Sequence, residues 1–209
     1  MVIDIFQDTV CPWCRIGKQN LQTALAEWQG EEVEIRYRAF QLDPTTPLEG
    51  HPYQETMLKK MGGTPEQLHS ALQRVTDAGQ AAGVRFDFSS VQTMPNTILS
   101  HQTIALTPEE RKQDMVDAIY RAYFEDGKDI GDREVLLRLA EQIGLNREDI
   151  SARLLAKEGL EEVEEDLEFA GKAGITGVPF FIINNKYALT GAQPAGTFLQ
   201  ALEKIQSEK

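Results

Sequence analysis

Cysteine, long apolar runs and basic charge are all scarce in this chain of 209 residues. Two cysteines cannot build the dense disulfide framework of a small secreted domain. No apolar run approaches the roughly 18 residues that indicate a transmembrane helix. The chain has 21 Lys and Arg against 33 Asp and Glu, a net charge of −12. Because Lys and Arg bind phosphate groups, this deficit argues against nucleic acid or an anionic membrane as a partner.

The first ten residues, MVIDIFQDTV, lack the features of a secretory signal. Such a signal has a basic region, an apolar region and a cleavage site with small residues. These residues instead have the composition of a β-strand, so we expect a cytosolic protein. In a reducing cytosol, two neighbouring cysteines are more often catalytic, redox-sensing or metal-binding than a permanent disulfide.

The N-terminal part is predicted to form a strand, a helix and a second strand. Residues 2–7 (VIDIFQ) and 33–40 (VEIRYRAF) are rich in β-branched and aromatic residues. Between them, apolar residues recur at helical spacing from Leu21 to Trp28, and Gly30 follows as a stop signal. Because two strands joined by a crossover helix lie parallel in one sheet, we expect a βαβ unit.

The middle of the chain is predicted to be helical after a loop at residues 41–52, which contain three prolines. The stretches at 64–67 (TPEQ) and 107–110 (TPEE) each have a capping Thr, a first-turn Pro and a capping-box partner, so both predict helix starts. The acidic stretch 158–168 carries apolar residues on one helical stripe. We interpret it as a helix with a solvated acidic face.

The C-terminal part is predicted to form two short strands and a helix. The segment 177–191 (GVPFFIINNKYALTG) has an Asn184-Asn185 pair able to adopt positive φ between two apolar runs, which indicates an antiparallel hairpin. A last amphipathic helix carries Phe198 and Leu202. The chain therefore consists of a βαβ unit, a helical block and a ββα unit.

Both cysteines lie in the stretch DTVCPWCRIG. Asp8 and Thr9 are potential caps of a helix that starts just after Cys11, and Pro12 suits its first turn. Free N–H groups and the positive end of the helix dipole favour thiolate over thiol at such a position. A stabilised thiolate also leaves easily, so a second thiol can resolve a mixed disulfide. We therefore assign Cys11 as the outward nucleophile and Cys14 as the shielded resolving thiol.

The cysteine pair has three other interpretations, of which intermolecular crosslinking has no specific support in the sequence. A zinc site needs two further ligands, and the three histidines, His51, His69 and His101, have no metal-binding spacing, so we expect no metal. Inert buried cysteines are the second alternative, and the CxxC spacing at a helix start argues against it.

Several motifs occur in the order found in one known family. CPWCRIGK after a first strand resembles that family's active-site helix, and YRAFQLDPTTPLEG resembles its second strand and loop. MPNTILSHQTIAL, AYFEDGKDIGDREVLLRLAEQIGL and GITGVPFFIINNKYALTGAQP are similar to its insertion and C-terminal segments. On these motifs the chain resembles the DsbA-like branch of the thioredoxin superfamily, particularly the cytosolic FrnE-like proteins.

The resemblance implies an α/β, thioredoxin-like fold whose βαβ and ββα halves are separated by a large all-helical insertion. The thioredoxin-like domain would comprise residues 1–50 and 160–209, and the insertion residues 51–159. The family also has a cis peptide at the position of Val178-Pro179, facing the CxxC motif, where Val178 pairs with an extended peptide or thiol ligand. From the residues alone, a trans proline opening a strand is the alternative.

Trp13 stands where the strongly oxidising members of the family have His. Because indole carries no charge to stabilise a thiolate, we do not expect a strongly oxidising potential. Trp13 either forms an apolar platform for substrate or packs under the insertion. Asn96, Thr97 and His101 are similar to a family segment that approaches the active site, although the apolar neighbours of His101 also fit a buried interhelical histidine.

The resemblance implies a thiol-disulfide oxidoreductase, with disulfide isomerase activity as a variant, that acts on thiol- or disulfide-containing proteins or peptides. No cofactor is expected, and glutathione is a candidate thiol co-substrate. Two alternatives stay open. One is a glutathione-dependent isomerase of the 2-hydroxychromene-2-carboxylate isomerase type, whose members carry Ser where Cys11 stands. The other is a non-enzymatic redox sensor or adaptor.

Overall fold

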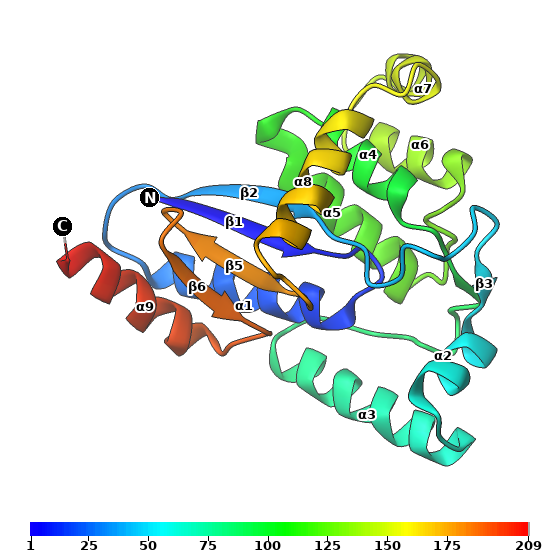
Figure 1. The fold of residues 1–209 in the computed structure, drawn as a ribbon, viewed down its shortest axis with the longest axis horizontal. Coiled ribbons are helices and arrows are strands. Elements are labelled where there is room, and N and C mark those ends of the chain that lie inside the picture. The colour runs from blue at the N-terminus through cyan, green and yellow to red at the C-terminus, as the bar shows by residue number, and fades with distance from the viewer. Residues whose placement is uncertain (209) are drawn as a thin grey trace.

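A four-stranded mixed sheet forms the centre of the protein, whose computed structural model describes residues 1–208 (Figure 1). Its strand order is β2-β1-β5-β6. β1 (Val2–Gln7) pairs parallel with β2 (Glu34–Ala39), as the predicted βαβ unit requires. β5 (Phe180–Ile183) pairs antiparallel with both β1 and β6 (Tyr187–Thr190).

Helices cover both faces of this sheet. α1 (Pro12–Glu27) and α9 (Ala195–Ser207) pack on the face that carries Ile5 and Phe181, within the main core. α8 (Leu160–Lys172) crosses the other face, as Figure 1 shows. There Ala170 and Ile175 pack with Phe6 in a second apolar cluster. The two faces follow from the alternation of side chains along each strand.

The insertion between β2 and α8 is mainly helical. Its helices lie in two groups in Figure 1, α2 and α3 on one side and α4 to α7 on the other. A short antiparallel pairing of two-residue strands, which the sequence does not predict, joins its beginning to its middle. The elements are β3 (His51–Pro52), α2 (Tyr53–Met61), α3 (Pro65–Ala81), β4 (Thr93–Met94), α4 (Ile98–Leu106), α5 (Glu109–Phe124), α6 (Arg133–Gln142) and α7 (Arg147–Leu155).

Several local predictions are confirmed. Asn184 and Asn185 adopt φ values of 52° and 54° in the turn between β5 and β6. Thr64 and Gln67 form both hydrogen bonds of a capping box at the start of α3. Phe198 and Leu202 are buried on α9, as its apolar stripe predicted. No helix within the described residues combines the length and apolarity needed to cross a membrane.

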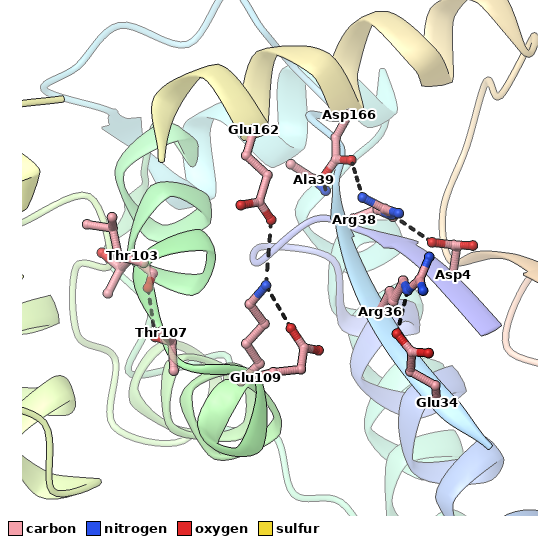
Figure 2. Close-up of polar contacts among 12 residues, drawn as sticks. Asp4, Glu34, Arg36, Arg38, Ala39, Thr103, Thr107, Glu109, Glu162 and Asp166 are labelled. Atoms are coloured by element: carbon pink, nitrogen blue, oxygen red, sulfur yellow. Dashed lines mark hydrogen bonds and ion pairs between the residues drawn. The ribbon is translucent and has the colours of Figure 1, made fainter. Parts of the chain in front are cut away.

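Two predicted helix boundaries are wrong. Thr107 does not cap α5, because it ends α4 and its hydroxyl donates to the main-chain oxygen of Thr103 over 2.8 Å (Figure 2). Pro108 occupies the N-cap position of α5 instead. Gly30 is not the stop of α1 either, since that helix ends with Trp28 in an extended conformation as its C-cap.

Polar contacts anchor the acidic helix α8 to the sheet. The buried Asp166 accepts a hydrogen bond from the Ala39 N–H over 2.9 Å and pairs with Arg38, which also binds Asp4 over 2.7 Å (Figure 2). Burial raises the pKa of the Asp166 carboxyl. The solvated acidic face is therefore interrupted by this one buried acid, which fixes α8 across β1 and β2.

Candidate active site

The first site element is the turn that leads into α1. The Cys11 N–H donates to the Asp8 oxygen over 3.0 Å, and Cys11 itself is the N-cap residue, with φ −92° and ψ 111°. The prediction that Asp8 and Thr9 cap this helix is wrong. The Asp8 carboxylate accepts from the Leu42 N–H, and the Thr9 hydroxyl bonds Ser100. Neither side chain caps the helix, so Cys11 directly precedes the free N–H groups of the first turn.

The two thiols are free and both are covered by protein. Cys14 is fully buried, as expected, whereas Cys11 is 4% exposed and therefore less outward than predicted. Burial raises the pKa of Cys14 well above its usual value, and a hydrogen bond with the Cys11 sulfur raises it further. The Cys14 thiol is therefore protonated at neutral pH.

The Val178-Pro179 loop forms the opposite wall of the site. The peptide bond between these residues is cis. The Cys11 thiol donates to the Val178 oxygen over 3.7 Å. α1 approaches this loop closely because residue 17 is glycine, since a Cβ there would lie only 2.9 Å from the Pro179 ring. The helix start and the loop therefore form one packed unit around the Cys11 sulfur.

This fold and motif agree with one protein family. The family model of the DSBA-like thioredoxin domain matches residues 2–203. The chain belongs to this family. A solved structure titled as the probable DsbA oxidoreductase SCO1869 from Streptomyces coelicolor is 32% identical. The match covers 100% of this chain and 91% of that one, with a TM-score of 0.92.

Two other solved structures share the fold of this DsbA-like chain at lower identity. The cytosolic disulfide reductase DsbM from Pseudomonas aeruginosa, solved with GSH, is 19% identical, with a TM-score of 0.67 over 99% of this chain and 100% of that one. A 2-hydroxychromene-2-carboxylate isomerase is 15% identical, with a TM-score of 0.74 over 100% and 97%. These similarities show the fold alone and confirm the thioredoxin-like architecture with its helical insertion.

Trp13, the third residue of the motif in this DsbA-like chain, is 42% exposed. This exposure favours an apolar platform over packing under the insertion, which would bury the indole. The loop that follows β2 carries two further exposed apolar residues, Leu42 and Leu48. Asn96 and Thr97 hold that loop, because Asn96 donates to the Thr46 oxygen and Thr97 accepts from Gln41.

His101 is buried, and its contacts lie on the sheet side of α4. Its Nε2 is 3.0 Å from the Phe40 oxygen and 3.5 Å from Asp8 Oδ1. The histidine therefore contacts the residue that follows β2 and the active-site turn, and it lies close to Val163 of α8. His51 and His69 are exposed, and no cluster of His, Cys, Asp or Glu in the described part of the chain could hold a metal ion.

Arg15, which the sequence analysis did not single out, attaches α1 to the insertion. Its guanidinium donates to the Arg85 oxygen over 2.7 Å, pairs with Glu125 and lies over the Phe86 ring. From the sequence alone, this arginine is expected to be exposed to solvent, because long charged side chains are mostly found on protein surfaces. Only the tertiary structure reveals that this one is buried.

Proposed function

We propose that this DsbA-like chain is a thiol-disulfide oxidoreductase with Cys11 as the nucleophile and Cys14 as the resolving thiol. The observation that carries the proposal is the position of Cys11 at the N-cap of α1, with its sulfur against Val178 and its partner thiol on the first turn. A thiolate at such a position is stabilised by the helix N-terminus and can act as both nucleophile and leaving group.

The reaction proceeds in two exchanges. The Cys11 thiolate attacks a substrate disulfide, forms a mixed disulfide and releases one substrate thiolate, which takes a proton from solvent. Cys14 then loses its proton and attacks the Cys11 sulfur, so that the Cys11–Cys14 disulfide forms and the second substrate thiolate leaves. The substrate disulfide gains two electrons and the protein dithiol loses two. The same steps in reverse oxidise a substrate dithiol.

The substrate class that we propose is a protein or peptide with a thiol or disulfide. The main chain of Val178, next to Pro179, would pair with an extended segment beside the reacting cysteine. Trp13 would supply apolar contact through its exposed ring. Glutathione is proposed as a thiol co-substrate rather than a resident cofactor, and the structural neighbour solved with GSH supports testing it first.

The cytosol is the proposed compartment, in line with the name of the same neighbour, the cytosolic reductase DsbM. We also propose that residues 1–50 and 160–209 form the thioredoxin-like domain and that residues 51–159 form the insertion. The position of α2 to α7 between β2 and α8 supports this division.

Dithiol-dependent reduction of insulin tests the function. The native chain is expected to turn over, Cys11→Ser to lose activity, and Cys14→Ser to stop at a mixed disulfide that mass spectrometry detects. Full activity in Cys11→Ser would overturn the proposal. A glutathione-dependent isomerase would instead keep its activity in Cys14→Ala without disulfide exchange, and a redox sensor would form the Cys11–Cys14 disulfide without turnover.

A further inference from the structure

A cavity of about 750 Å³ lies in the insertion, bounded by α2, α3 and the loop before β4. These two helices lie together in Figure 1, apart from α4 to α7. The volume is within the range of small-molecule sites, about 300–1,000 Å³. Cys11, Cys14, Trp13 and Pro179 do not line this cavity, so it is separate from the thiol site.

The floor of the cavity is apolar and aromatic. α3 contributes Leu68, Leu72 and Thr76, which are at helical spacing and share one face of the helix. The loop before β4 adds Phe86 and Phe88, whose nearly parallel rings have centroids 5.3 Å apart. Aromatic rings bind other aromatic groups and organic cations, so both are candidate ligand classes.

Two main-chain hydrogen bonds fix the walls of the cavity. The Asp87 N–H donates to the Phe124 oxygen over 2.7 Å, and the Tyr53 N–H donates to the Gln92 oxygen over 2.9 Å. The Phe86 ring also meets the Phe124 ring edge-on, with 5.1 Å between centroids. The loop is therefore tied to α5 at one end and to α2 at the other, and the cavity is preformed.

One hydroxyl group at the cavity has no partner. Tyr53 lines the cavity and is 7% exposed, yet its hydroxyl forms no hydrogen bond within residues 1–208. Protein atoms enclose the unpaired hydroxyl of Tyr37 but not that of Tyr53, which can therefore reach a bound molecule. Burial raises the pKa of Tyr53, so the hydroxyl keeps its proton and can both donate and accept.

The charged groups at the cavity are acidic. Glu55 and Asp87 line it, and no Lys or Arg of the described residues does. The Glu55 carboxylate has no ion pair or hydrogen bond within residues 1–208, and Ser89 holds the Asp87 carboxylate through its N–H and hydroxyl. Arg85, whose charge reaches Asp87, pairs with Glu125 over 3.1 Å. The lining therefore favours a cation over an anion.

We propose that this cavity binds a small molecule that combines an aromatic body with an ammonium group. The aromatic body would lie among Leu72 and Phe88, the ammonium group would face the carboxylates of Glu55 and Asp87, and one N–H would donate to the Tyr53 hydroxyl. Glutathione, whose net charge is negative, is not expected here. The cavity thus differs from the thiol site in ligand class as well as in position.

Three naphthalene probes of similar size and different charge test the proposal on the intact protein. They are 1-naphthylmethylammonium, the neutral 1-naphthylmethanol and the anionic 1-naphthylacetate. Equilibrium dialysis at pH 8 avoids the usual titration range of histidine, since His69 also lines the cavity. We expect the ammonium to bind about fivefold more tightly than the alcohol and the carboxylate to bind most weakly. Binding of the ammonium that is no tighter than that of the alcohol would overturn the proposal.

Charge reversal at the cavity supplies a matched pair of variants. Glu55→Lys changes an exposed side chain of the lining and should weaken ammonium binding by about tenfold while it strengthens carboxylate binding. Glu141→Lys changes the net charge equally, but it lies on α6 in the other group of helices and should leave all three affinities unchanged. Equal losses in both variants would show that only the net charge of the protein matters, which contradicts a built site.

Tyr53→Phe removes only the unpaired hydroxyl. Ammonium binding should weaken by about two- to tenfold while the protein stays as stable as the native chain, because no hydrogen bond within the protein is lost. Unchanged binding would contradict the role of this hydroxyl.

Nuclear magnetic resonance locates the probe without any variant. Addition of the ammonium should shift the amide signals of α3 and of residues 86–92, and shifts confined to Cys11 and Trp13 would overturn the proposal. Cys11→Ser should bind the ammonium as the native chain does. Failure of the cavity proposal and failure of the proposed thiol chemistry are therefore distinguishable.

Discussion

The thiol of Cys11 and the main-chain oxygen of Val178 lie 3.7 Å apart, although 167 positions separate them in the sequence. This contact joins the start of α1 to the loop before β5. It places the reacting sulfur beside main-chain groups to which an extended peptide could hydrogen-bond. The reactivity of the site therefore depends on how closely the helix and the loop approach each other.

Gly17 controls that approach. In Gly17→Ala the new Cβ would lie 2.9 Å from the Pro179 ring and 3.2 Å from Phe181, so the loop must move. We expect the free energy of unfolding to decrease by about 1–3 kcal/mol, as for other overpacked sites, and the rate of insulin reduction to decrease as well.

Gly171→Ala on α8 is the matched control. Its Cβ would meet no described atom within 4 Å, and the change should stabilise the helix by about 0.5–1 kcal/mol. Equal effects of the two changes would contradict this account.

The buried Cys14 thiol predicts a specific dependence of stability on pH. Its pKa is raised in the folded protein, mainly by burial, so the unfolded chain loses this proton first as the pH rises. The free energy of unfolding should therefore decrease above about pH 8.5, the usual pKa of a cysteine. Chemical denaturation of the reduced protein at several pH values measures the slope. Cys14→Ala should give a shallower slope, and an identical slope would argue against a buried neutral thiol.

Two buried tyrosines should respond in opposite ways to loss of the hydroxyl group. The Tyr37 hydroxyl has no hydrogen-bond partner within residues 1–208, and burial raises its pKa. Tyr37→Phe should stabilise the protein by about 1 kcal/mol, because a buried unsatisfied group is removed. Tyr120 donates to Gln7, so Tyr120→Phe should cost about 1–3 kcal/mol. Thermal unfolding of both variants tests the contrast, and destabilisation by Tyr37→Phe would show that its hydroxyl is satisfied.

Trp13 should matter for large substrates only. Its exposed ring offers apolar contact to a protein, whereas a small aromatic disulfide needs only the Cys11 sulfur. Loss of about 1.4 kcal/mol of such contact corresponds to a tenfold effect, so Trp13→Ala should raise KM for a protein disulfide by about tenfold. The rate at which Cys11 reacts with dithiobis-nitrobenzoate, a small aromatic disulfide, should not change. A loss in both assays would indicate that Trp13 supports the helix start instead.

Most of the fold could be predicted from short sequence patterns whose residues are neighbours along the chain. The β-branched and aromatic composition of residues 2–7, the Asn184-Asn185 turn and the capping box at Thr64 each depend on neighbouring residues, so composition and spacing were sufficient. The family resemblance supplied the cis peptide before Pro179, which spacing could not provide, since most X-Pro bonds in folded proteins are trans.

Long-range contacts explain what was missed. Asp8 has the usual sequence position of a helix cap, but the turn from Asp8 to Cys11 makes the cysteine itself the cap. The contact of Asp8 with His101 joins two distant segments, and no periodicity indicates it. The capping signal at Thr107 failed for a related reason, because the preceding helix extends up to that residue. The positions of side chains that contact the active-site turn from distant segments could therefore not be predicted.

The pairing of Ile3 with Ile183 has a consequence for biosynthesis. A ribosome makes Cys11 and Cys14 early, whereas the strand that completes the sheet beside β1 and the loop that covers the Cys11 sulfur are made only after the whole insertion. Contacts of such high sequence separation also form slowly. During translation both thiols are thus more exposed than in the folded protein, where Cys11 is 4% exposed and Cys14 is fully buried, until residues 178–183 have docked.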